Sequence, residues 1–230
     1  MFARKWGYDR TMCGRYSLDT DDGRLIKRFN LASAPAGIRP DYNVTPEQEM
    51  PAILLGGDGE RRAELMRWGI SRIVGKDVVR ELINARADKI FGGFWRKTVC
   101  SRRCLIPATS FFEWQKTADG KRPFLIRPRD EELFAFAGIW DIWRDSDGHE
   151  ISSYAIITTE SSGETRAVHD RMPVMLYREQ EAEWLSPERD TPEALEGLLL
   201  PSADGRCEVY EVSPAVNNPR NNSPEVLLPV

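Results

Sequence analysis

The stretch CLIPATSFFEWQKTADGKRPFLIRPRDEELFAFAGIWDIWRDSDGHEISSYAIITT, residues 104–159, decides the fold class of this chain. Short apolar or alternating runs rich in β-branched and aromatic residues recur along it, and such runs are typical of β-strands. Asp119-Gly120 is a dipeptide that favours the tight turn of a β-hairpin. We therefore predict antiparallel strands, at 104–107, 110–115, 123–127, 133–143 and 153–159.

Similar patterns continue on both sides of this stretch. Upstream, strands are predicted at 13–18, 52–55 and 63–68, with Gly56-Gly57-Asp58-Gly59 as the turn between the last two. An amphipathic helix is predicted at 21–31, whereas residues 70–83 have no decisive pattern. Downstream, we predict helices at about 178–185 and 191–199, the second capped by Thr191-Pro192, and a last strand at 207–213.

These elements predict a single α+β domain, because neither an internal repeat nor a linker divides the chain. The expected core is a mostly antiparallel, curved sheet or an open β-barrel with short peripheral helices. The domain is expected to cover residues 13–230. Residues 1–12 are expected to be an N-terminal leader that is removed, or a start-site misassignment.

The composition is that of an ordinary globular protein and excludes several classes. Of 230 residues 41% are hydrophobic, and apolar runs such as Ala52-Ile53-Leu54-Leu55 are far shorter than the ~20 residues of a membrane span. Residues 1–11 lack the apolar segment of a secretory signal, so a cytoplasmic protein is expected. A net charge of -4 argues against coating nucleic acid through overall charge, but it is compatible with a local basic groove.

The four cysteines indicate neither a disulfide scaffold nor a metal site in a chain of this length. Cys100 and Cys104 form a C-x3-C pair, but neither His149 nor His169 has a metal-ligand spacing to it. We therefore expect no metal and no cofactor.

The segment Met12-Cys13-Gly14-Arg15-Tyr16 resembles a second beginning of the chain. If the mature protein starts at Cys13, this residue has both a thiol and a free α-amine, whose pKa lies near ~8. Such a 1,2-aminothiol condenses with an aldehyde and closes to a five-membered thiazolidine. The alternative is that Cys13 is a small buried residue of the first strand, where free cysteines usually lie.

Two side chains are candidates for proton transfer. Glu113 lies among aromatic residues in FFEW, and a desolvated carboxyl has a raised pKa that suits acid–base work near neutral pH; the alternative is a strand-edge Glu exposed to water. His169 precedes Asp170 and Arg171, which are candidates to orient it and to bind an anion. The alternative for His169 is a purely structural role in a loop.

Asn84 and Arg86 are two residues apart in INARAD, so an extended backbone directs them to one side. An amide and a guanidinium together suit phosphate or sugar oxygens, although Asn84 is also a plausible helix cap. Trp68, Phe94 and Trp95 alternate with basic residues, a mixture typical of a single-strand groove and equally of core packing.

Taken together, these segments resemble the SRAP family (SOS response-associated peptidase, the abasic-site processing proteins). The resemblance covers nearly the whole chain from Met12. It implies that the N-terminal Cys captures the ring-opened aldehyde of an abasic site in single-stranded DNA as a stable, lesion-shielding thiazolidine cross-link, with lyase-like and self-processing activity. The matching segments are MCGRYSL (12–18), YNVTPEQ (42–48), RWG (67–69), INARAD (83–88), RCLIPATSFFEW (103–114), IITTE (156–160), HDRMPVML (169–176) and VNNPRNNSPEVL (216–227).

By the same resemblance, Cys13 is the nucleophile, Asn84 holds the deoxyribose, Glu113 shuttles protons, and His169 assists proton transfer and reversal. Arg86 is expected to grip phosphate, Trp68 to stack on or wedge beside a base, and Thr158 and Asn43 to line the pocket. The residues expected to contact DNA are Arg15, Asn43, Pro46, Trp68, Gly69, Arg86, Thr158 and Arg171.

The expected partner is single-stranded DNA with abasic sites. The protein is expected to be a monomer and to be associated with the nucleoid when it is bound to damaged DNA. A further phosphate contact is implied between Arg86 and Glu113, with Arg96, Lys97, Arg102 and Arg103 as candidates. Two alternatives stay open: a cysteine peptidase acting on other proteins, and a non-covalent single-strand binder.

Overall fold

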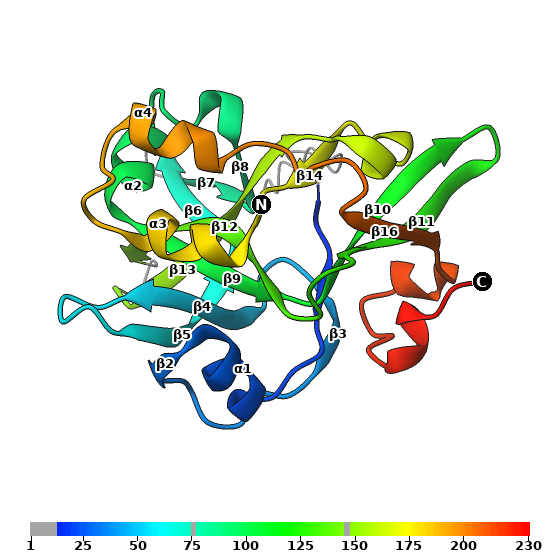
Figure 1. Ribbon diagram of the computed structural model, residues 1–230, viewed down its shortest axis with the longest axis horizontal. Helices are drawn as coiled ribbons and strands as arrows, with labels where there is room; N and C mark the ends of the chain where they lie inside the picture. Colours follow the sequence, from blue (N-terminus) through cyan, green and yellow to red (C-terminus); the bar gives the residue numbers. More distant parts are fainter. Residues whose placement is uncertain (1–12, 75–76, 145–147) are drawn as a thin grey trace.

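A closed ring of β-strands forms the centre of the protein (Figure 1). A computed structural model describes residues 13–74, 77–144 and 148–230 of the chain. Neighbouring strands of the ring are antiparallel until β5 returns to β13, where the two run parallel with Tyr154 beside Trp68. In order around the ring, the strands are β13 (Glu150–Glu160), β12 (Phe134–Arg144), β9 (Arg103–Ala108), β4 (Glu49–Leu55) and β5 (Arg61–Trp68).

A second sheet continues from the ring, because the chain passes from β9 into β10 with only Thr109 between them. β10 pairs with β1 on one side, where Tyr16 faces Phe111, and with β11 on the other, where Glu113 faces Phe124. The strands of this sheet are β16 (Cys207–Glu211), β11 (Gly120–Pro128), β10 (Ser110–Thr117), β1 (Tyr16–Leu18) and β3 (Asp41–Val44).

Both faces of the second sheet are covered. Phe111 points into the main core, whereas Phe112 joins a smaller cluster with Val216 and Val226 of the C-terminal segment. Neighbouring residues of β10 thus face opposite sides of the sheet, as alternation along a strand requires. The C-terminal segment therefore packs against β10, the strand that carries Glu113, and Figure 1 shows it beside β16.

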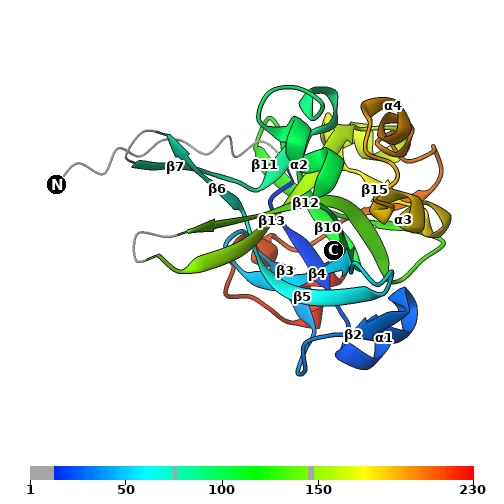
Figure 2. The same cartoon turned by 90° about the vertical axis from the view of Figure 1, so that its left-hand side faces the viewer.

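The remaining elements surround this frame, and β6 and β7 extend away from it next to β12 and β13 (Figure 2). None of the helices in the described ranges is both long and apolar enough to cross a membrane. The strands are β2 (Leu31–Ser33), β6 (Ile70–Val74), β7 (Asp77–Leu82), β8 (Asn84–Arg86), β14 (Arg171–Pro173) and β15 (Met175–Leu176). The helices are α1 (Asp22–Phe29), α2 (Trp95–Ser101), α3 (Arg178–Leu185) and α4 (Pro192–Leu195), with short 3-10 turns η1 (Ala87–Lys89), η2 (Gly163–Ala167), η3 (Glu196–Leu198), η4 (Pro214–Asn217) and η5 (Pro224–Leu227).

The structure confirms the predicted α+β class and most of the predicted elements. The helix at 178–185 is found with those bounds, and Thr191 caps α4 by accepting a hydrogen bond from the Ala194 amide. Helix α2 was not predicted, because Phe94 at its N-cap offers no side-chain acceptor and no sequence signal marks its start. The predicted leader, residues 1–12, lies outside the described residues.

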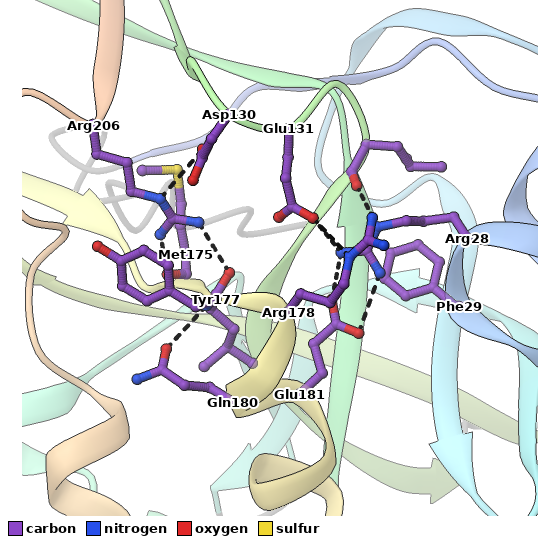
Figure 3. A network of polar contacts seen from close by, with 12 residues as sticks. Arg28, Phe29, Asp130, Glu131, Met175, Tyr177, Arg178, Gln180, Glu181 and Arg206 are labelled. Carbon is purple, nitrogen blue, oxygen red and sulfur yellow. Dashed lines mark hydrogen bonds and ion pairs between the residues drawn. The ribbon is translucent and has the colours of Figure 1, made fainter.

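A buried ionic network joins the outer helices to the ring (Figure 3). Glu181 of α3, only 1% exposed, accepts hydrogen bonds from Arg28 of α1 at 2.6 Å and from Arg61 of β5 at 3.2 Å. Glu131 binds Arg28 and Arg178, both at 3.1 Å. The network holds the helices in one arrangement, because a buried charge that loses its partner is costly.

Candidate active site

Cys13 and Glu113 meet at the junction of β1 and β10. The Cys13 thiol and the Glu113 carboxyl form a side-chain hydrogen bond, and their residues are 2% and 4% exposed. Extending the antiparallel register of Tyr16 and Phe111 places Gly14 opposite Glu113, and Cys13 is the residue before it, outside the regular part of β1. A nucleophile and a proton-transfer group are therefore in direct contact.

Burial keeps both groups of this pair neutral. Desolvation raises the pKa of Glu113 from 4.5 to about 8, against the opposing hydrogen bonds from the Trp114 amide and the Cys13 thiol. The pKa of the Cys13 thiol is raised well above its ordinary value by burial first and by Glu113 second. One carboxyl oxygen of Glu113, Oε1, has no partner among the described residues, so it is available to a reacting group.

Asn84 fixes the backbone of the nucleophile. Its side-chain amide donates a hydrogen bond of 2.9 Å to the Cys13 carbonyl, while its own Oδ1 is buried without a partner in the described part of the chain. β8 places Asn84 there by running parallel to β13, with Asn84 beside Ile156. A buried acceptor without a donor is costly and points to a ligand that donates to it.

His169 lies in the loop after η2, close to the Glu113 strand. The Gln115 amide of β10 donates a hydrogen bond of 2.8 Å to the Ala167 carbonyl, which ties that loop to β10. The His169 Nδ1 accepts from the Arg171 amide at 3.1 Å and lies 3.1 Å from Asp170. Gln115 was not among the predicted residues, although it lies on the same face of β10 as Glu113.

A pair of arginines, Arg86 and Arg171, lies next to Thr158. Arg171, 7% exposed, donates to the Thr158 carbonyl at 2.6 Å and to its hydroxyl at 3.1 Å. Arg86 lies across from Thr158 on β8 and forms a bidentate pair with Asp88, at 3.0 and 2.8 Å. The structure thus brings together three of the predicted contact residues, and Asp88 as an unpredicted partner.

Trp68 is not placed where a base can stack on it, which corrects the role expected for it. Its side chain is fully buried, stacks parallel to Tyr154 and donates its indole N–H to the Ile83 carbonyl at 2.9 Å. The reason is the closure of the ring, since β5 pairs with β13 at Trp68 and directs the indole into the core. Gly69 follows Trp68 in the chain and is buried. Pro46 is half-buried near Trp68, because the next two residues, Glu47 and Gln48, form backbone hydrogen bonds with Trp68.

Arg15 and Asn43 contact the C-terminal segment. The Asn43 amide donates to the carbonyls of Val216, Asn218 and Asn221, at 2.8 to 3.3 Å, and its Oδ1 accepts from Arg15 at 2.6 Å. Burial lowers the pKa of Arg15. These bonds give Asn43 a structural role, and its place in the wall of the pocket stays a prediction.

Among the four basic residues that compete for one phosphate, the structure favours two. Arg103 is buried and donates to three backbone carbonyls, and Arg102 is paired with Asp141. Arg96 and Lys97 are exposed on α2. Because all three guanidinium nitrogens of Arg103 are used by these carbonyls, α2 is the better candidate surface.

These features agree with the comparison of the chain with known families. The model of the family "SOS response associated peptidase (SRAP)" matches residues 12–219. The chain belongs to the SRAP family. Its relatives include the abasic site processing proteins YoqW of Bacillus subtilis, 39% identical over 94% of this chain and 99% of that protein, and HMCES of Gallus gallus, 30% identical over 95% and 78%.

A solved structure carries the same SRAP fold. The crystal structure of a protein from Bacteroides thetaiotaomicron superposes with a TM-score of 0.84 at 25% identity, over 95% of this chain and all of the other. Within the residues that the structure describes, no three His, Cys, Asp or Glu side chains gather as a metal site requires.

Proposed function

We propose that this SRAP protein captures the ring-opened aldehyde of an abasic site in single-stranded DNA as a thiazolidine on Cys13. The observation that carries the proposal is the contact between the Cys13 thiol and a buried Glu113 whose pKa is raised to about 8. The names of the relatives, abasic site processing proteins, support the same substrate. The chemistry requires a free α-amine on Cys13, and therefore a mature chain that begins there.

The residues supply each proton that the reaction moves. The Cys13 amine adds to the aldehyde, and the neutral Glu113 carboxyl protonates the resulting hydroxyl, which leaves as water and yields an iminium ion. The Glu113 carboxylate then takes the thiol proton while sulfur attacks the iminium carbon and closes the ring. Glu113 is therefore protonated again at the end of the reaction. Asn84 orients the nucleophile and donates or accepts at the sugar, and His169 assists proton transfer in the reverse direction.

We also propose that the same site removes what precedes Cys13, by hydrolysis of the Met12–Cys13 peptide bond with one water. A peptidase acting on other proteins is a weaker candidate. Such an enzyme needs a thiolate paired with a histidine base, whereas Cys13 here is a neutral thiol in contact with a carboxyl.

The test combines intact mass with trapping on a denaturing gel. The mass of the purified protein establishes where it begins, and the protein is then mixed with a single-stranded oligonucleotide that carries one abasic site. We expect a mass that starts at Cys13 and a heat-stable shifted band without borohydride, lost in Cys13→Ala. The matched control Cys207→Ala removes another buried thiol and should keep the band. No band from a protein beginning at Cys13 would refute the proposal.

A further inference from the structure

Asp88 forms ion pairs with two arginines, Arg86 and Arg171, at the edge of the site. Its Oδ1 accepts from the Arg86 Nε at 3.0 Å and lies 3.5 Å from the Arg171 Nη1, while Oδ2 accepts from the Arg86 Nη2 at 2.8 Å. A carboxylate held in this way has the geometry that a phosphate takes with arginine. Asp88 thus occupies an anion position between the two cations.

The two arginines differ in freedom. The Arg171 side chain is 8% exposed and is anchored by both oxygens of Thr158, yet its Nε is buried with no partner in the described ranges. The side chains of Arg86 and Asp88 are 43% and 50% exposed. Asp88 can therefore rotate into water and leave a fixed Arg171 and a mobile Arg86 to receive another anion.

Carboxylates outnumber the two arginines while Asp88 is in place. Besides Asp88, the carboxylates of Asp170 and Glu160 act on both arginines. A phosphate that approaches the site is therefore opposed by three carboxylates, and the one in direct contact must be displaced before the phosphate binds.

We propose that Asp88 is an internal competitor of DNA, which occupies the phosphate position of Arg86 and Arg171 until a DNA phosphodiester displaces it. This inference rests on the proposed function, because the displacing group is the phosphate next to the captured lesion. An intact strand offers only the phosphate and must displace Asp88 with that contact alone. A strand with an abasic site is also held at Cys13 and Asn84, but its phosphate must displace the same carboxylate, so Asp88 weakens the binding of both strands.

The experiment measures binding of a fluorescent, lesion-free single-stranded oligonucleotide by anisotropy at several salt concentrations. In Asp88→Asn we expect about two- to fivefold tighter binding, since an exposed ion pair of this kind is worth up to about that factor. The slope of log affinity against log salt should steepen by about 0.7, the value for one further phosphate on a single strand. The affinity for a strand with an abasic site should rise by the same factor, because both strands must displace Asp88.

Two further variants make the result specific. Asp58→Asn is the matched control, because Asp58 forms an equally bidentate pair with Arg62 at the β4–β5 turn, at 2.8 and 2.5 Å, and removes the same charge. It should leave the binding curve unchanged. Asp88→Glu keeps the carboxylate and should bind intact DNA as the unaltered protein does.

Several outcomes would overturn the inference. If Asp88→Asn binds the intact strand equally or more weakly with an unchanged salt slope, Asp88 only orients Arg86. Equal tightening in Asp88→Glu or Asp58→Asn would assign the effect to local packing or to overall charge. These binding measurements use intact DNA and involve no covalent step. Failure of the proposed function would be seen in another assay, as the absence of a denaturation-resistant band from the unaltered protein.

Discussion

Replacing Glu113 by Gln should change the pH dependence of stability in one direction. The native carboxyl has a pKa of about 8 against an ordinary value of 4.5, so between these values the folded protein holds a proton that the unfolded chain has released. Stability must therefore fall as pH rises through this window, by about 1.4 kcal/mol for each pH unit. Gln does not titrate and is free of this loss.

The expected difference between Glu113→Gln and the unaltered protein is close to constant below about pH 4. Relative to that baseline, the variant should gain about 3 kcal/mol at pH 7 and about 5 kcal/mol above pH 9. The baseline itself depends on how the Gln amide is accommodated beside the thiol. The diagnostic quantity is thus the change of the difference with pH.

The assay is urea unfolding at a series of pH values from 4 to 9, with Glu64→Gln as the control. Glu64 is exposed on β5, and its replacement removes one negative charge without altering the site. A difference for Glu113→Gln that is independent of pH, or that falls with pH, would show that Glu113 is ionised in the native protein. In the trapping assay, the acid form is required, so the rate of capture should decline above about pH 8 in the unaltered protein.

Three further substitutions test the placement of buried polar groups. Asn43→Ala should lower the free energy of unfolding by about 2–4 kcal/mol in urea, because three carbonyls lose a donor, whereas the exposed Asn222→Ala should cost about 1 kcal/mol or less. Equal losses would contradict the structural role of Asn43. Trp68→Phe should lower the free energy of unfolding by about 1–2 kcal/mol, because the hydrogen bond to the Ile83 carbonyl is lost, and should leave the affinity for single-stranded DNA unaltered. Weaker DNA binding at unchanged stability would instead support stacking of a base on Trp68. Glu181→Gln should cost about 3–5 kcal/mol, and a loss below about 1 kcal/mol would mean that its two arginines find other partners.

The strands and turns were predictable where neighbouring residues alone decide them. The β4–β5 hairpin follows from two apolar runs around Gly56-Gly57-Asp58-Gly59, and Thr191-Pro192 marks the start of α4 by its cap. Cys13, Glu113, Asn84 and His169 were predictable as candidates from their residue types and from the resemblance to the SRAP family. Helix α2 has no cap signal, and Asp88 has no distinctive pattern apart from its spacing to Arg86.

The local elements, the α+β class and the family could be inferred from the sequence, because spacing, turn chemistry and motifs act over a few residues. Which polar groups are free to act depends instead on the packing of distant segments. The parallel pairing of β5 with β13 closes the ring and buries Trp68, and contacts across more than 170 residues commit Asn43 to the C-terminal segment. Such long-range pairings depend on how all strands pack together, so no local pattern encodes them.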